Sequence, residues 1–339
     1  MSNIRKIDQK KFNHYKTDKE RIMHLLKYAI LAPSTHNSQP WLFRIEKSNC
    51  EIHINPEKVI DHADPSRRDM YISIGCCLEN LILAAKFYGV YRKHEITPEG
   101  TLTAKIFFDF VMKRKNKANY NNIVKTILKR RNMRGSYMKK EISASMIKSI
   151  TSLSNNYPEV SLHVISSSEQ IKDITELTSC AIRLAYNSES FRNEMSDWFI
   201  HNTSTKKEGI PGYTIMLPNL LSYAFPFIVK HINIGQLIAF VNRKSLKTAP
   251  IVCSFTAKNN DQKTWIQVGR YAERAMLELQ ANNIATSIYV AAIEIGSLSK
   301  QLAAILDSQE KPQFLFSAGF MQGERKYTPR YSPEQKIIS

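Results

Sequence analysis

Two helical runs in different halves of the chain share one pattern, and this repeat constrains the fold more than any other feature. The runs are residues 74–90 (IGCCLENLILAAKFYGV) and 268–284 (VGRYAERAMLELQANNI). Aligned without a gap, they place Gly75 against Gly269 and Gly89 against Asn283. Gly and Asn tolerate the left-handed conformation that ends many helices, so both helices are predicted to stop at the same place. Both runs are apolar nearly all round, which is typical of buried helices.

The segments that flank these helices repeat as well. In the first half a helical run (residues 22–31) is followed by two strand-like runs (42–45 and 51–54). A further strand-like run (104–111) comes after the central helix. The second half has the same order at residues 144–153, 160–165, 250–256 and 313–320. We therefore predict an α+β fold whose halves, residues 1–122 and 123–339, pack as a pseudo-dimer. Residues 188–233 have no counterpart in the first half and are expected to form a helical lid insertion.

A polar loop interrupts regular structure in the first half at residues 32–41 (APSTHNSQPW). Prolines end regular structure on both sides of it. Its hydroxyl, imidazole and amide groups suit a polar, planar ligand; they belong to Ser34, Thr35, His36, Asn37, Ser38 and Gln39. The alternative is a solvated helix-to-strand turn, for which this composition is also typical. The loop by itself leaves both interpretations open.

Composition narrows the class of protein. The chain has 339 residues and a net charge of +18, but its lysines are scattered and form no zinc-finger, RNP or basic-zipper pattern, so we expect no nucleic-acid partner. Residues 4–21 lack the apolar core of a secretory signal, which favours a cytoplasmic protein. The five cysteines form no CxxC pair or Cys/His cluster, so neither a disulfide framework nor a metal site is indicated.

The most apolar stretch of the second half is residues 220–241. Pro226, Lys230, His231, Asn233 and Gln236 interrupt it, which argues against a membrane span. We expect a buried or cofactor-covering helix pair there, and no membrane partner.

A basic run at residues 129–137 (KRRNMRGSY) follows the boundary between the halves. This run and the APSTHNSQPW loop together resemble the nitroreductase-like FMN-binding family. The resemblance implies that Arg130 and Arg134 hold the FMN phosphate and that Asn132 meets the pyrimidine edge of the flavin. Guanidinium groups suit a phosphate dianion, and a cation stabilises the charge that develops on reduced flavin.

The same resemblance implies further cofactor contacts. Arg330, next to Pro329 in the closing segment, would be another phosphate ligand. A backbone N–H near Tyr289 and Val290 would meet flavin N5. The polar loop would line the flavin through Pro33, Ser34, Thr35, Asn37 and Gln39. His36 is either a flavin neighbour and proton donor or a residue that stabilises the turn.

A third motif, residues 63–69 (ADPSRRD), precedes the first central helix. Asp64 followed by Pro65 can simply begin that helix, and this structural role is the alternative to a functional one. The three motifs in this order, with a mid-chain lid, resemble the two-half Acg-like branch of the family.

The loop occurs only in the first half and the Arg motif only in the second, since the corresponding stretches read SNNYP and YKTDKER. One complete FMN site per chain is therefore expected, in a monomer with an internal pseudo-dimer or a weak homodimer. The resemblance implies NAD(P)H-dependent reduction of a small flat acceptor, a nitroaromatic or a quinone, through flavin N5. The alternative is an FMN-sequestering or storage protein whose lid excludes the second substrate.

Overall fold

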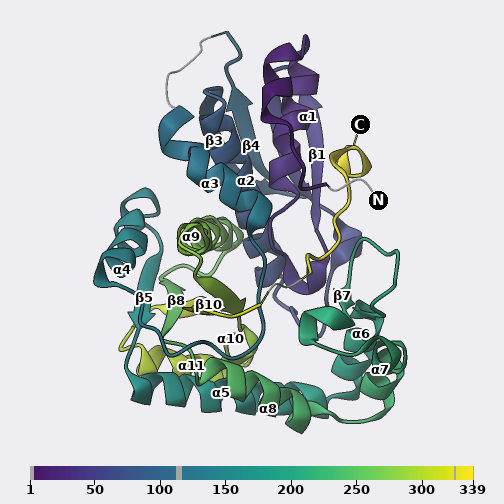
Figure 1. Ribbon diagram of the computed structural model, residues 1–339, viewed down its shortest axis with the longest axis vertical. Coiled ribbons are helices and arrows are strands. Elements are labelled where there is room, and N and C mark those ends of the chain that lie inside the picture. Colours follow the sequence, from purple (N-terminus) through teal and green to yellow (C-terminus); the bar gives the residue numbers. More distant parts are fainter. Residues whose placement is uncertain (1–3, 112–116, 324–325, 339) are drawn as a thin grey trace.

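The computed structural model describes residues 4–111, 117–323 and 326–338, and it has the predicted α+β class. Each half contains one four-stranded antiparallel sheet (Figure 1). The first sheet has the strand order β1-β2-β4-β3, formed by β1 (Trp41–Glu46), β2 (Asn49–Ile54), β3 (Tyr91–Glu99) and β4 (Leu102–Phe108). The second has the order β5-β8-β10-β9, formed by β5 (Ser161–Ile165), β8 (Ile251–Ala257), β9 (Ala285–Ile288) and β10 (Lys311–Gly319).

The two sheets have the same topology. In each, the first two strands along the chain are neighbours, and the fourth strand lies between the second and the third. The central helix follows the second strand in both cases, as α2 (Arg68–Phe87) and α9 (Gln262–Ala281). The repeat seen in the sequence of the two helices therefore extends to the strand order of both sheets.

The central helices cross at the aligned glycines. A Cβ on Gly75 would lie 2.1 Å from the carbonyl oxygen of Ile266, and a Cβ on Gly269 would lie 2.0 Å from that of Ile72. Ile72 and Ile266 each precede their own glycine by three residues, so the contact is reciprocal, as across a two-fold axis. No side chain larger than hydrogen fits at this crossing.

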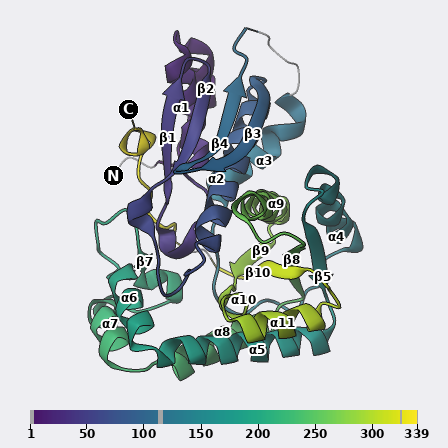
Figure 2. The ribbon, with the colours of Figure 1, turned by 180° about the vertical axis from the view of Figure 1, so that it is seen from behind.

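Both central helices lie between the two sheets (Figures 1 and 2). One hydrophobic core joins residues of both halves around them. Within the described residues α2 is long and apolar enough to cross a membrane, and its 94% burial identifies it as a core helix. The predicted helix ends are confirmed, because Gly89 and Asn283 have φ angles of 73° and 59°.

Shorter helices cover the remaining faces. They are α1 (Asp18–Ala29), α3 (Lys117–Lys129), α4 (Ala144–Thr151), α10 (Ala291–Glu294) and α11 (Gly296–Ile305). The chain then returns to its beginning: after β10 the tail crosses to the first half, where Ile338 N–H donates to the carbonyl of Phe43 (2.8 Å). The tail, yellow in Figure 1, thus lies beside β1.

The inserted segment is longer than the sequence suggested. Everything between β5 and β8 is added relative to the first half, and it begins before residue 188 and ends after residue 233. It contains α5 (Ser168–Asn187), α6 (Glu189–Trp198), α7 (Asn219–His231), α8 (Gly235–Leu246) and the short strands β6 (Phe199–Ile200) and β7 (Ile210–Pro211). The expected helix pair at residues 220–241 is present as α7 and α8, but it is not fully buried, because the outer side chains of both helices are exposed.

Candidate functional site

A cavity of about 780 Å³ lies where the two halves and the inserted helices meet. Eleven of the twelve residues that the family resemblance places at or near the flavin line it: Pro33, Ser34, Thr35, His36, Asn37, Arg130, Asn132, Arg134, Tyr289, Val290 and Arg330. They come from both halves of the chain. The exception is Gln39, which is fully buried and is not among the lining residues. A volume of this size is typical of sites for cofactors and small molecules.

The polar loop is held in a tight, unusual conformation. His36, Asn37 and Gln39 have positive φ angles of 51°, 58° and 51°. Ser34 Oγ accepts a hydrogen bond from the backbone N–H of Gln39 (3.0 Å), which closes the turn. Left-handed backbone in non-glycine residues costs free energy and is concentrated at functional sites.

The two loop amides bind other parts of the protein. The Nδ2 of Asn37 donates to the carbonyls of Lys207 and Pro329 (3.2 Å each), and the Nε2 of Gln39 donates to the Lys207 carbonyl (2.7 Å). The Oε1 of Gln39 accepts from the backbone N–H of Tyr331 (2.9 Å). Gln39 therefore ties the insertion and the tail to the first half. The sequence alone did not show this structural role, because both partners are distant in the chain.

Three buried guanidinium groups gather at one side of the cavity. Arg130 Nε lies 3.2 Å from Oε1 of Glu273, which has no exposed surface. Arg330 donates to Oδ1 of Asn37 (2.5 Å) and to the Ala32 carbonyl (3.0 Å). The third is Arg5, whose Nη1 donates to the Leu128 carbonyl (3.0 Å). The sequence analysis missed Arg5, because nothing in its local pattern distinguishes it from the solvated lysines nearby.

These cations are close enough to influence one another's ionisation. Burial lowers the pKa of Arg330 well below its usual range, and the neighbouring Arg5 and Arg130 lower it further. Burial and Arg130 likewise lower the pKa of Arg5 to about 10. The carboxylate of Glu273 raises both pKa values, but by less than burial lowers them. Guanidinium groups gathered at a cavity wall offer charge-assisted hydrogen bonds to an anion, so this side of the cavity suits a phosphate.

Asn132 and Arg134 lie further along the same wall. The Oδ1 of Asn132 accepts from the backbone N–H of Ile288 (3.1 Å). Arg134 donates to Oδ1 of Asn242 (2.8 Å), and its guanidinium lies 5.1 Å from the centre of the Tyr289 ring. The Tyr289 N–H is already donated to the Leu315 carbonyl (3.0 Å), so it is not available to a ligand.

His36 lies under the inserted segment, with its ring centre 5.8 Å from that of Trp198. Burial lowers the pKa of His36 to about 4. The imidazole is therefore neutral near pH 7, which disfavours a role as an imidazolium proton donor.

The ADPSRRD motif contributes to a cluster of ionisable side chains at the cavity wall. Asp64 begins α2, since its carboxylate accepts from the backbone N–H groups of Asp69 (3.1 Å) and Met70 (2.9 Å). Arg68 pairs with Asp69 (3.1 Å) and with Glu294, a residue that sequence reasoning missed. Burial raises the pKa of Asp64 to about 7 and that of Glu294 to about 8. Asp69 and Glu294 also line the cavity.

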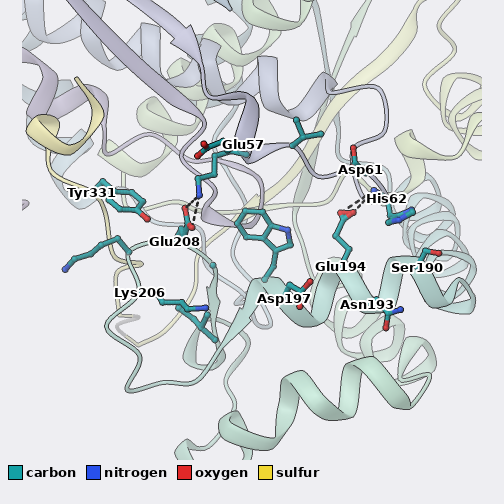
Figure 3. A pocket seen from close by; sticks show the side chains of 16 residues that line it. Glu57, Asp61, His62, Ser190, Asn193, Glu194, Asp197, Lys206, Glu208 and Tyr331 are labelled. Carbon is teal, nitrogen blue, oxygen red and sulfur yellow. Dashed lines mark hydrogen bonds and ion pairs between the residues drawn. The ribbon is translucent and has the colours of Figure 1, made fainter. Parts of the chain in front are cut away.

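The inserted segment supplies apolar side chains to the cavity wall. Phe199, Tyr213 and Met216 line it. Trp198 lines a second, outer groove of about 740 Å³ between residues 57–62 and the insertion (Figure 3).

Polar contacts in and near this groove hold the insertion against the first half. Lys58 Nζ lies 2.8 Å from Oε2 of Glu208. Glu194 accepts from the backbone N–H of His62 (2.5 Å), and the dashed lines in Figure 3 mark both interactions. The inserted segment therefore covers the cavity, and its charged side chains Glu194 and Glu208 bind the first half.

Comparisons with known proteins identify related sequences and similar structures. No protein-family model matches the chain. Two curated proteins of Mycobacterium tuberculosis, MT3217 and Rv3131, whose names assign them provisionally to the NAD(P)H nitroreductases, are each 30% identical to it over 87 residues. This match covers 26% of the chain, and the chain spans 25% of the length of these relatives.

Solved structures give a second comparison. The FMN-dependent nitroreductase NfnB from Mycobacterium smegmatis, in complex with NADPH, is 16% identical, with a TM-score of 0.42, and covers 65% of this chain and 98% of its own. The FMN and NADPH-dependent nitroreductase NfnB from Sphigopyxis sp. strain HMH is 14% identical, with a TM-score of 0.43, and covers 64% and 98%. The curated matches support the nitroreductase-like family that the motifs of the chain indicate.

Proposed function

We propose that the protein is an FMN-binding oxidoreductase that uses NAD(P)H to reduce a small flat acceptor, such as a nitroaromatic or a quinone. The observation that carries this proposal is the group of buried cations, Arg5, Arg130 and Arg330, at one side of a cavity of about 780 Å³. These guanidinium groups suit a phosphate, and the remaining wall is apolar enough for a flat ring. The two curated relatives bear names of the same reaction class.

The residues of the chain divide the binding between phosphate and ring. Arg130 and Arg330 would hold the phosphate of FMN, with Arg5 adding positive charge from behind. Arg134 and Asn132 would lie along the polar edge of the ring, and the polar loop would bound the site from the first half. Bound FMN would supply hydride acceptance and electron transfer, while the protein supplies position, charge and exclusion of water.

One such site per chain is part of the proposal. The polar loop comes from the first half and the arginines at residues 130, 134 and 330 from the second, and the pseudo-symmetric positions read SNNYP and YKTDKER. A single FMN bound at the seam of the two halves follows from this distribution.

The absorption spectrum of the purified protein tests the proposal. We expect flavin absorption bands, with about one FMN per chain after extraction. Anaerobic NADPH should bleach these bands, and a quinone should restore them. A colourless protein that FMN does not reconstitute would refute the flavin proposal, and two FMN per chain would refute the single-site model.

A storage function is the second candidate, because the contacts of Lys58 and Glu194 fasten the insertion over the cavity. A cover that stays closed would keep NAD(P)H and acceptors away from the flavin. The two functions differ in one measurement: a yellow protein that anaerobic NADPH fails to bleach would favour storage, and rapid bleaching would exclude it.

A further inference from the structure

Large apolar side chains project into solvent from the outer faces of α7 and α8. The most exposed are Leu220 (87%), Phe227 (67%) and Phe240 (64%). We define the α7–α8 patch as Leu220, Tyr223, Phe227, Ile232, Leu237, Phe240 and Val241, all of which are exposed. The two helices meet at a bend of 118°, so the patch spans the corner between them. Exposed apolar side chains gathered on adjoining helices are uncommon on soluble proteins and mark a site of interaction.

The residues of the patch recur with helical periodicity, so on each helix they lie on one face. On α7 its members recur at residues 220, 223 and 227, while Phe225 and Val229 face the core of the insertion. On α8 they recur at 237, 240 and 241, while Ala239 and Leu246 are buried. Each helix is therefore apolar on its inner and its outer side. The inner side packs within the protein, and the outer side requires another apolar environment.

The segment that carries the patch has charged side chains of one sign only. Residues 209–260 contain no Asp or Glu. Lys230, Lys244 and Lys247 are exposed on or directly after the same helices. Arg243 also lies on α8, where it pairs with Glu176 of α5. In a chain with a net charge of +18, this segment combines exposed apolar side chains with an unbroken excess of positive charge.

The patch also borders the mouth of the cavity. Leu237 and Val241 belong to the patch and line the cavity at the same time. Leu184 and Met216 are likewise both exposed and cavity-lining, with 47% and 49% of their surface accessible. The cavity therefore approaches solvent at the edge of the patch. Both views place α7 and α8 at the end of the molecule away from the first sheet (Figures 1 and 2).

We propose that the α7–α8 patch docks on the surface of an anionic lipid bilayer. Amphipathic helices with Leu and Phe on the apolar face and Lys beside it bind such surfaces, because the apolar side chains enter the acyl boundary and the lysines meet the lipid phosphates. This proposal revises the expectation of no membrane partner. A second copy of the chain fits less well, since a two-fold contact would bring the lysines of each copy against those of the other.

Sedimentation with vesicles tests the proposal on the full chain. The protein should bind vesicles of equimolar phosphatidylglycerol and phosphatidylcholine, and should not bind vesicles of phosphatidylcholine alone. Phe227→Asp should weaken binding about tenfold or more, because the aromatic ring no longer enters the lipid. Lys244→Glu should weaken it about fivefold for each unit of charge removed. High salt should also release the protein.

Two matched variants serve as controls. Val111→Asp changes a side chain that is 92% exposed on the first half, and Lys19→Glu reverses an exposed charge on α1. Neither should alter vesicle binding by more than about twofold. Flavin content is measured on the same samples, so a colourless protein that still binds anionic vesicles would refute the proposed function and leave the docking surface supported.

Three outcomes would overturn the docking surface. The first is an absence of binding to anionic vesicles, and the second is equal binding by the wild type and by Phe227→Asp. The third is a dimer in light scattering that Phe227→Asp dissociates while vesicle binding is absent, which would assign the patch to contact between copies.

Discussion

The buried pair of Arg130 and Glu273 allows stability and cofactor binding to be separated. Glu273 has no exposed surface, Arg130 retains 2%, and their closest charged atoms are 3.2 Å apart. Arg130→Met leaves the carboxylate buried without its cation, which should lower the free energy of unfolding by about 3–5 kcal/mol. The double variant Arg130→Met/Glu273→Met replaces both charges with apolar groups of similar length and should recover part of that loss. The recovery is partial because Arg5 and Arg330 then lose the carboxylate that raises their pKa values.

The double variant then reports on the cofactor. Each charge-assisted hydrogen bond to a phosphate is worth roughly 1.5–3 kcal/mol, so losing Arg130 should weaken FMN binding about ten- to hundredfold in a protein that remains folded. Urea unfolding of the flavin-free protein measures the stability of each variant, and flavin fluorescence titration measures affinity. A single variant as stable as wild type would refute the argument about the buried pair. Unchanged FMN affinity in the folded double variant would remove Arg130 from the proposed phosphate site.

Three further predictions concern other parts of the molecule. Arg134→Ala should release FMN on gel filtration. The urea midpoint should not change, because the side chain of Arg134 hydrogen-bonds to Asn242 on a partly exposed wall. Flavin retained by this variant would contradict the assignment of Arg134 to the FMN site. Burial raises the pKa of Glu294 in the folded protein to about 8, above the ordinary 4.5. The contribution of this group to the free energy of unfolding is therefore fully present below pH 4.5 and is lost as the pH rises through 8. Glu294→Gln should flatten this pH dependence in thermal unfolding. Gly269→Ala should lower the free energy of unfolding by about 1–3 kcal/mol or more, because the new Cβ would lie 2.0 Å from a carbonyl oxygen. Gly296→Ala is the control: a Cβ there would meet no atom within 4 Å, so its free energy of unfolding should not change. Chemical denaturation measures both variants.

Local pattern was enough to predict the framework of the fold. Strands β1 and β2 and both central helices follow from the periodicity of their own residues, and Gly89 and Asn283 end the helices as predicted. The aligned glycines turned out to lie at the contact between halves, which the sequence did not predict. A repeat about an axis places equivalent residues opposite each other.

What the sequence did not show depends on partners far away in the chain. Arg5 is 123 residues from the carbonyl that it binds, and its own neighbours read as an ordinary solvated segment. Gln39 was assigned to a ligand, yet the amide contacts a backbone carbonyl 168 residues away. The charge cluster joins Arg68 to Glu294, and only tertiary packing brings the two together. Side-chain chemistry predicts that a group needs a partner, but the fold decides which one.

At the crossing of α2 and α9 the two halves make equivalent backbone contacts, although their sequences differ. In a symmetric homodimer every substitution occurs twice, so a residue on one side of the axis cannot change alone. Here Gly75 and Gly269 preserve the close contact of such an axis within a single polypeptide. The loop sequences of one half can therefore change without the same change occurring in the other half. The inserted helices α5 to α8, present on one side only, are a departure from symmetry that a homodimer could not have acquired.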